Sequence, residues 1–228
     1  MLTAIRPRVG KVLVAGAAIV AVLGATAAPA RADGVGAPVV LSAGHVDVIE
    51  VEYEDGVLEL GVHDDTVEPG VHRHHSDVIF VVTSQARTSV PGDPAFGFLG
   101  RAGSPVWVLP QAQNEDLLWA GIATEELEEG VFEADSVDLT VQQLISAPSS
   151  GQVAIYTEDQ FGQPTVLANS RDGLPDVVEL PVGDHLHANW AFSKPGIYLL
   201  KAKVGATLAG TGTVIGSDSV YLRFVVLP

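Results

Sequence analysis

The chain has 228 residues, of which 28 are acidic and 12 basic, giving a formal net charge of −16, and it contains no cysteine. The acidic excess argues against a nucleic-acid partner, because phosphate contacts need clustered Lys and Arg. The lack of cysteine excludes disulfides, thiolate metal ligands and cysteine nucleophiles, so an exported protein of this size has to rely on its core.

The N-terminus is predicted to be a secretory signal peptide. Residues 1–11 form a basic head, 12–28 run apolar, and 30–32 have the small-x-small pattern of a cleavage site. An apolar run of 17 residues is short for a membrane span of roughly 20, and a retained N-terminal anchor is the alternative. We place cleavage after Ala32, with cleavage after Ala30 as the alternative. Residues 33–228 then carry 28 acidic and 8 basic residues, a formal net charge of −20. Such a charge draws cations to the surface, and solubility alone is the alternative explanation for it.

Short segments of strand type dominate residues 33–228. Residues 46–53 alternate between apolar and polar, 54–56 signal a turn, and 57–62 alternate again, which predicts a β-hairpin. The apolar run at 78–82 predicts a strand buried on both faces. Further strands are expected at 105–109, 116–122, 136–145, 152–157, 177–180, 197–204 and 219–226.

Helical signals are limited to one short acidic turn at 124–130. Many short strands between turn signals indicate an all-β fold. We therefore expect an antiparallel β-sandwich, immunoglobulin-like or jelly-roll-like, that forms a single domain over 33–228.

The histidines carry the clearest chemical pattern. All seven lie beyond the signal segment: His45, His63, His72, His74, His75, His185 and His187. Residues i and i+2 of a strand point to one face, so His185 and His187 can present two imidazoles together, as His45 can beside Asp47. Imidazoles with a carboxylate suit Zn²⁺, Mn²⁺ or Fe²⁺. We predict a metal site at His45, Asp47, His185 and His187, with zinc or manganese as the cofactor.

A possible second metal cluster lies at His72, His74 and His75, with an exposed loop as the alternative. Residues 70–82 loosely resemble the first motif of the cupin barrels, in which a His-x-His and a following Glu bind a metal. Asp77 stands where that motif has Glu, and no second cupin motif follows at the expected spacing. His63 directly follows a strand, where it could serve only to cap the turn.

Catalytic motifs are missing from the sequence. It contains neither a Gly-x-Ser-x-Gly elbow nor a Gly-x-x-x-x-Gly-Lys phosphate loop. The paired acids at 125–126 and 128–129 are typical of a solvated turn. We do not predict an enzyme, and a metal-dependent hydrolase is kept as an alternative.

Residues 183–198 read Gly-Asp-His-Leu-His-Ala-Asn-Trp-Ala-Phe-Ser-Lys-Pro-Gly-Ile-Tyr. This segment resembles the actinobacterial surface-anchored protein domain, a repeat placed here at about 140–228, whose hallmark is His-x-His-x-Asn-Trp-x-Phe followed by Pro-Gly-x-Tyr. Residues 44–47, 106–111 and 118–126 are similar to the longer choice-of-anchor M architecture.

The resemblance implies a secreted or cell-surface protein of actinobacteria, linked to ABC importers of the metal-uptake type and to their substrate-binding proteins. It also implies that His45, Asp47, His185, His187 and Asn189 are the positions to test. No Leu-Pro-x-Thr-Gly sorting signal occurs in the sequence, so we expect a released protein or one that a partner holds at the surface.

The same segment has a plain structural interpretation. Trp190 and Phe192 share one strand face and are expected to be buried, and residues 195–196 form a turn into the strand that begins near Tyr198. We predict a hairpin, with His185 and His187 just before its first strand.

Three functions follow from the sequence. The chain could capture a divalent transition metal or a metal-bearing ligand for an importer, serve as a structural or adhesive module without a small ligand, or act as a hydrolase. They differ on one geometric point, namely whether the imidazole nitrogens of His45, His185 and His187 converge.

Overall fold

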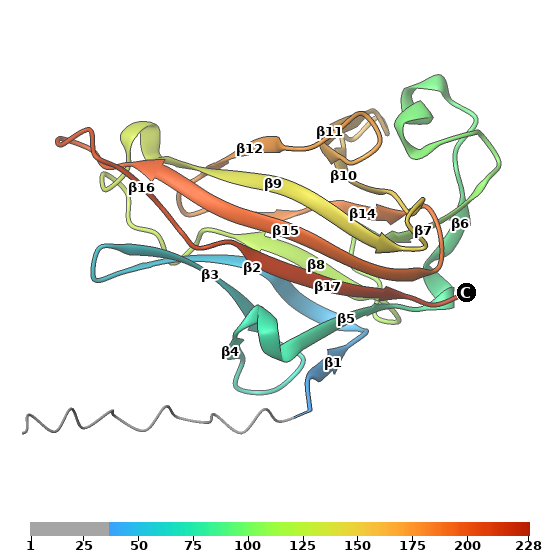
Figure 1. The fold of residues 1–228 in the computed structure, drawn as a ribbon, viewed down its shortest axis with the longest axis horizontal. Helices are drawn as coiled ribbons and strands as arrows, with labels where there is room; N and C mark the ends of the chain where they lie inside the picture. The colour runs from blue at the N-terminus through green and yellow to red at the C-terminus, as the bar shows by residue number, and fades with distance from the viewer. Residues whose placement is uncertain (1–36) are drawn as a thin grey trace, which may run out of the picture. The chain divides into compact units, whose positions relative to one another are not determined.

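The computed structural model describes residues 37–228, and the predicted signal peptide lies outside these residues. Strands make up most of the described chain (Figure 1). They are β1 (Val39–Leu41), β2 (Gly44–Glu54), β3 (Val57–Asp64), β4 (Val71–Arg73), β5 (Val78–Val82), β6 (Arg87–Ser89), β7 (Pro105–Leu109), β8 (Leu118–Ala123), β9 (Ser136–Ala147), β10 (Val153–Glu158), β11 (Pro164–Asn169), β12 (Asp176–Pro181), β13 (His185–His187), β14 (Asn189–Phe192), β15 (Gly196–Thr207), β16 (Val214–Gly216) and β17 (Val220–Val226).

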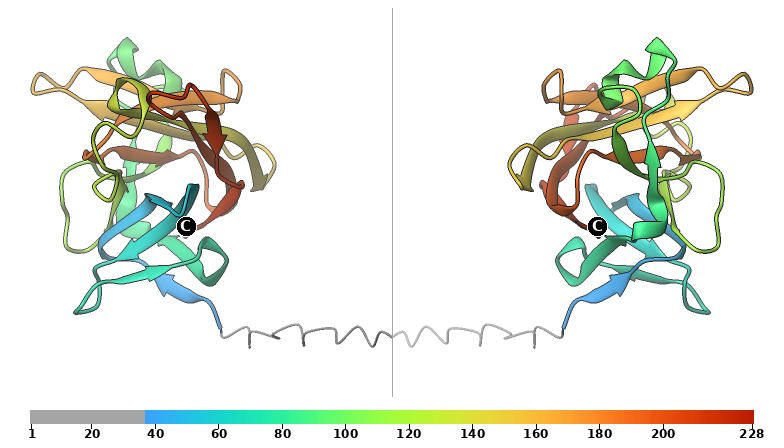
Figure 2. Two further views of the ribbon diagram at one scale, coloured as in Figure 1. Left: turned by 90° about the vertical axis from the view of Figure 1, so that its left-hand side faces the viewer. Right: turned by 90° about the vertical axis from the view of Figure 1, so that its right-hand side faces the viewer.

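The strands form three sheets around one large hydrophobic core, and a second, smaller buried cluster includes Phe96 and Tyr156. Sheet A has the order β1-β5-β17-β15-β9-β12, with β16 paired to β15; sheet B has the order β13-β8-β2-β3-β4, and sheet C the order β11-β10-β14-β7-β6. Figure 2 shows the blue and cyan strands of sheet B on one side and the yellow and orange strands β9 to β12 on the other. Val51 of β2, Trp190 of β14 and Phe224 of β17 are fully buried in the same core cluster. The predicted all-β, sandwich-like fold is confirmed.

The sheets are mixed, because three strand pairs among residues 37–228 are parallel where the sequence predicted antiparallel neighbours. β1 pairs with β5, β5 with β17, and β2 with β8 in this way. Parallel neighbours are joined through a long stretch of chain, which the local alternation does not reveal. The strand predicted at 78–82 is β5, but only Val78, Phe80 and Val82 are buried, so it is not covered on both faces as expected.

The predicted hairpin after His187 is also wrong, because β14 and β15 belong to different sheets. β14 pairs with β10 and β7, whereas β15 pairs with β9, β16 and β17. The link between them turns a corner of the sandwich. There the Tyr198 hydroxyl donates a hydrogen bond of 2.6 Å to the Lys194 carbonyl, a contact that fixes corners in other sandwiches.

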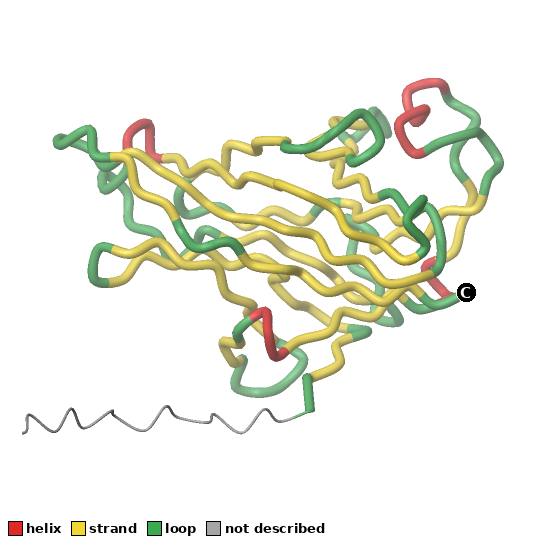
Figure 3. The backbone as a smooth tube through the Cα atoms, in the orientation of Figure 1, coloured by secondary structure: helices red, strands yellow, loops and turns green. Residues whose placement is uncertain are grey.

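The helical segments differ in place and number from the single turn predicted at 124–130. Figure 3 shows the short helices of the described chain in red. They are 3₁₀ helices, η1 (His75–Asp77), η2 (Ser84–Ala86), η3 (Pro94–Leu99) and η4 (Glu133–Asp135). Thr124 is buried, and its hydroxyl donates to the Pro181 carbonyl at 2.6 Å while the Asp184 N–H donates to it at 3.0 Å. Thr124 therefore ties the end of β8 to the approach of β13.

A β-bulge in β2 places two acidic side chains on the same face of sheet B. The register of β2 against β3 shifts between Asp47 and Glu50, so that Asp47 pairs with His63 and Glu50 pairs with Gly61. His63 and Gly61 are two residues apart on β3 and share one face, so Asp47 and Glu50 share a face as well. Regular alternation would have separated them, and re-aiming side chains in this way is a known effect of bulges.

Candidate metal centre

One row of strand partners crosses the whole of sheet B. His187 pairs with Gly121, and Gly121 with Asp47. Asp47 in turn pairs with His63, and His63 with His72. Since paired residues project to the same side of a sheet, five strands together place imidazoles and a carboxylate on one face.

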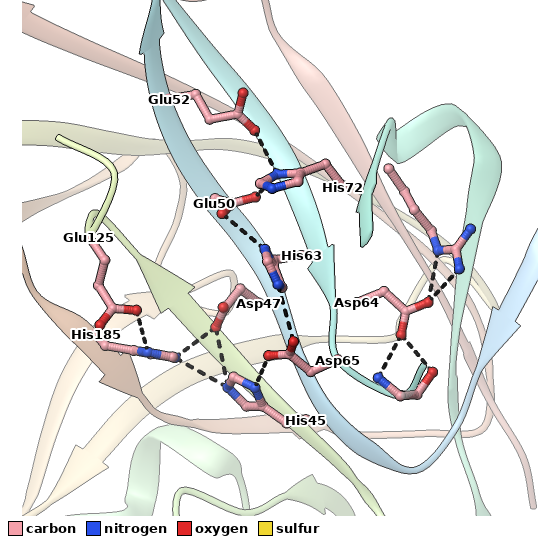
Figure 4. A network of polar contacts seen from close by, with 12 residues as sticks. His45, Asp47, Glu50, Glu52, His63, Asp64, Asp65, His72, Glu125 and His185 are labelled. Carbon is pink, nitrogen blue, oxygen red and sulfur yellow. Dashed lines mark hydrogen bonds and ion pairs between the residues drawn. The ribbon is translucent and has the colours of Figure 1, made fainter. Parts of the chain in front are cut away.

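The residues of the first group are His45, Asp47, His185 and His187, called here the three-histidine cluster. The Nε2 atoms of His45 and His185 lie 3.2 Å apart. Asp47 Oδ1 lies 2.8 Å from His185 Nε2 and 3.5 Å from His45 Nε2 (Figure 4). One ring nitrogen of His187 completes the group, with the ligand nitrogens of the three histidines all within 4.8 Å of one another. Ligand atoms around a tetrahedral ion with bonds of 2.0–2.1 Å are about 3.3 Å apart, which is close to the separations found here.

Carboxylates hold the far sides of two of these rings. His45 Nδ1 lies 2.8 Å from Asp65 Oδ2, and His185 Nδ1 lies 2.9 Å from Glu125 Oε2. A neutral imidazole that donates from Nδ1 keeps a lone pair on Nε2. The His45 and His185 lone pairs then face each other and Asp47, so three acceptors meet without a donor. This is the arrangement in which carboxylates orient histidines toward a metal.

Asp47 itself needs a positive partner. It is 4% exposed, and its Oδ1 atom makes no hydrogen bond of acceptable geometry within residues 37–228. Burial raises the pKa of the Asp47 carboxyl, although the imidazoles of His185 and His45 act in the opposite direction. A cation between the three side chains would satisfy the carboxylate and both lone pairs.

The third histidine is fixed by an aromatic stack. The His187 ring lies 3.7 Å from the Trp119 ring, with an angle of 7° between the planes. Burial, followed by the nearby His185 and His45, lowers the pKa of His187 to about 4. His187 is therefore neutral near pH 7, the form in which an imidazole binds a metal. Its Nδ1 atom is buried and makes no hydrogen bond to the described residues.

The three-histidine cluster occupies space that is open because Gly121 has no side chain. A Cβ atom at this position would collide with Asp47 Oδ1 and would lie 3.0 Å from His185 Nε2. Gly121 stands between Asp47 and His187 in the strand row. A larger residue at position 121 would fill the space between Asp47 and His185, where the ligand atoms meet.

A second group lies further along the same face, and we call it the two-histidine cluster (Glu50, Glu52, His63 and His72). Glu50 Oε2 lies 2.9 Å from His72 Nδ1, and Glu50 Oε1 lies 3.3 Å from His63 Nδ1. Glu52 Oε1 lies 3.4 Å from His72 Nδ1. Burial raises the pKa of Glu50; burial also opposes a charge on His72, but Glu50 and Glu52 outweigh this effect and raise the His72 pKa.

The predicted second cluster of His72, His74 and His75 does not form. His72 faces Glu50, whereas His74 is exposed and His75 is buried. Among residues 37–228, neither of the last two belongs to a group of side chains close enough to hold one metal ion. The reason is local geometry: the chain leaves β4 at Arg73 and enters η1 at His75, so the three rings do not share one strand face.

His75 instead supports the bulge in β2. Its Nε2–H donates to the Val48 carbonyl at 2.9 Å, between Asp47 and Glu50. Burial lowers the pKa of His75, although the hydrogen bond to the Val48 carbonyl opposes this. A neutral His75 thus holds the backbone that aims both buried carboxylates at the site face.

Asn189, which the family resemblance implied as a site position, lies next to the site as a support. Its Oδ1 accepts a hydrogen bond of 2.9 Å from the Gln111 N–H. The Gln111 carbonyl in turn accepts a hydrogen bond of 2.9 Å from Trp119 Nε1, and Trp119 stacks on His187. Asn189 therefore helps to position His187 through two intermediate residues.

The structure brings together all four residues of the predicted metal site and adds others that the sequence did not indicate. These additions are Glu50, Glu52, His63, Asp65, Trp119, Gly121 and Glu125. Part of this set could have been found from the sequence, because Glu50 and Glu52 lie in the same alternating strand as Asp47. The bulge that turns Glu50 to the face of Asp47 has no such signal.

No protein-family model matches the chain, and no match was found among the curated proteins or the solved structures.

Proposed function

We propose that this protein is a secreted or cell-surface binding protein that captures a divalent transition metal, zinc or manganese, at the three-histidine cluster. The observation that carries the proposal is the meeting of His45 Nε2, His185 Nε2 and Asp47 Oδ1 at separations of 2.8–3.5 Å. Three imidazoles and one carboxylate form a complete set of ligands for a tetrahedral ion. The predicted signal peptide and the resemblance around Asn189 support an extracellular location and delivery to an ABC importer.

A structural module without a ligand is the competing function. In that case a proton between the Nε2 atoms of His45 and His185 would satisfy the cluster, and the histidines would only stabilise sheet B. The acidic surplus of 16 charges over the chain favours cation capture instead, because it raises the local concentration of cations.

Isothermal titration of the purified protein with Zn²⁺ and Mn²⁺ tests the proposal. We expect binding tighter than about 10 μM, and its loss at this cluster in the double variant His185→Ala, His187→Ala. The matched control is His74→Ala, which removes an exposed imidazole outside the cluster. Absence of binding, or equal binding by the double variant, would refute metal capture at this cluster.

A further inference from the structure

The two-histidine cluster gathers two carboxylates around one imidazole nitrogen. His72 Nδ1 faces Glu50 Oε2 at 2.9 Å and also Glu52 Oε1 at 3.4 Å. A single ring N–H points at one acceptor, so it cannot serve both carboxylates with good geometry. A cation that accepts lone pairs from all of these atoms has no such restriction.

Glu50 is the buried centre of this cluster. Its side chain is 5% exposed, and both of its oxygens face imidazoles, His63 Nδ1 at 3.3 Å and His72 Nδ1 at 2.9 Å. One ligand atom from each of the three residues lies within 4.8 Å of the others. A buried carboxylate is costly unless a positive partner compensates it, and a cation held between Glu50 and the two imidazoles would supply that positive charge.

Gly61 and Gly70 leave room around this cluster. A Cβ atom at Gly61 would lie 2.9 Å from Glu52 Oε1, and one at Gly70 would lie 2.6 Å from His63 Nε2. The side chains of Glu52 and His63 therefore occupy space that the backbone provides only because these positions carry no side chain.

Asp65 joins the two clusters. Its Oδ2 lies 2.8 Å from His45 Nδ1, and its Oδ1 lies 3.1 Å from His63 Nε2. It thus holds the outer nitrogen of one ring in each cluster and leaves His45 Nε2 and His63 Nδ1 to face inward (Figure 4).

We infer that Glu50, Glu52, His63 and His72 form a second site for a divalent transition metal, and that Asp65 couples it to the three-histidine cluster. Two imidazole nitrogens with carboxylate oxygens suit the same borderline ions as the first cluster. No side chain belongs to both ligand sets, and the carboxylate of Asp65 links His45 of one set to His63 of the other. Catalytic two-metal sites instead hold their ions about 4 Å apart, so this arrangement fits binding of two separate ions. The second site goes beyond the proposed function, whereas its coupling through Asp65 rests on that function.

The experiment measures how many Zn²⁺ ions each protein binds, by titration and by elemental analysis after desalting. The proteins are the wild type, the double variant His63→Ala, His72→Ala, the double variant His45→Ala, His185→Ala, and the control His74→Ala. We expect two ions for the wild type and the control, and one for each double variant. The Glu52 side chain is 35% exposed, so Glu52→Gln tests the same site with little risk to folding, and we expect it to weaken only one of the two binding events.

The outcomes separate the two proposals. One ion in the wild type that survives in His63→Ala, His72→Ala overturns the second site and leaves the proposed function standing. One ion that survives only in His45→Ala, His185→Ala supports the second site and refutes the proposed function. No bound zinc refutes both. The coupling predicts that Asp65→Asn weakens both binding events by about 10- to 100-fold; weakening of one alone would overturn the coupling.

Discussion

His45 and His185 stand 140 positions apart in the chain, yet their Nε2 atoms lie 3.2 Å apart. His45 lies on β2 and His185 on β13, and β8 is paired between these two strands. The carboxylates of Asp65 and Glu125 hold the opposite nitrogens of the two rings. The sheet therefore brings two imidazoles into a fixed geometry that neither strand possesses alone.

Metal removal is expected to lower the thermal stability of the protein. A ligand that binds only the folded state stabilises it by about 2.7 kcal/mol at 100 times its Kd. For a domain of this size that corresponds to a rise of roughly 5–10 °C in Tm. Calorimetry with Zn²⁺ and with a chelator measures this shift. An unchanged Tm would favour a structural role for the histidines.

Gly121→Ala is expected to weaken zinc binding by roughly tenfold or more, because the new methyl group collides with Asp47 and crowds His185. Titration with Zn²⁺ measures the loss. Gly97→Ala is the matched control, since a Cβ at Gly97 meets nothing within 4 Å. Equal affinity for both variants would show that the space beside Gly121 is not where the ion binds.

Glu125→Gln tests the carboxylate that orients His185. The side chain is more than half exposed, so the exchange should leave the fold intact. We expect zinc affinity to fall by about 10- to 100-fold. Glu126→Gln removes the same charge from the neighbouring exposed residue, and we expect little change from it. If both variants lose affinity equally, the surface charge matters and the contact with His185 does not.

His75→Ala is expected to destabilise the protein by about 1–3 kcal/mol, because it leaves the buried Val48 carbonyl without its donor. The sign of the pH dependence follows from the lowered folded pKa of His75. Its contribution is present above the ordinary imidazole pKa of about 6.5 and is lost as the pH falls through the lowered folded value.

Urea unfolding at several pH values measures both effects of His75→Ala, with His74→Ala as the exposed control. The stability difference between wild type and His75→Ala should shrink on acidification. A difference that stays constant would contradict the inference that His75 is neutral in the folded protein. Zinc titration of His75→Ala tests whether the bulge positions Asp47. Loss of the contact with Val48 should move the Asp47 carboxylate and weaken zinc binding.

The sequence by itself determined the fold class and which side chains of the first cluster share a strand face. The alternation in 46–53 and 57–62 predicted a hairpin, and β2 and β3 pair in that way. The i, i+2 spacing put His45 beside Asp47 and His185 beside His187, and the structure places these four residues in one cluster. These inferences succeed because side-chain direction in a strand is a local property with a period of two.

Only the tertiary structure decided which strands are neighbours and where the local period breaks. The parallel pairing of β2 with β8, the separation of β14 from β15, and the bulge that brings Glu50 beside Asp47 all depend on distant contacts. His63 and His72 meet Glu50 for the same reason, and His74 and His75 do not join them. Strand pairing and bulges are set by long-range packing and hydrogen bonding, which the order of residues along one strand does not encode.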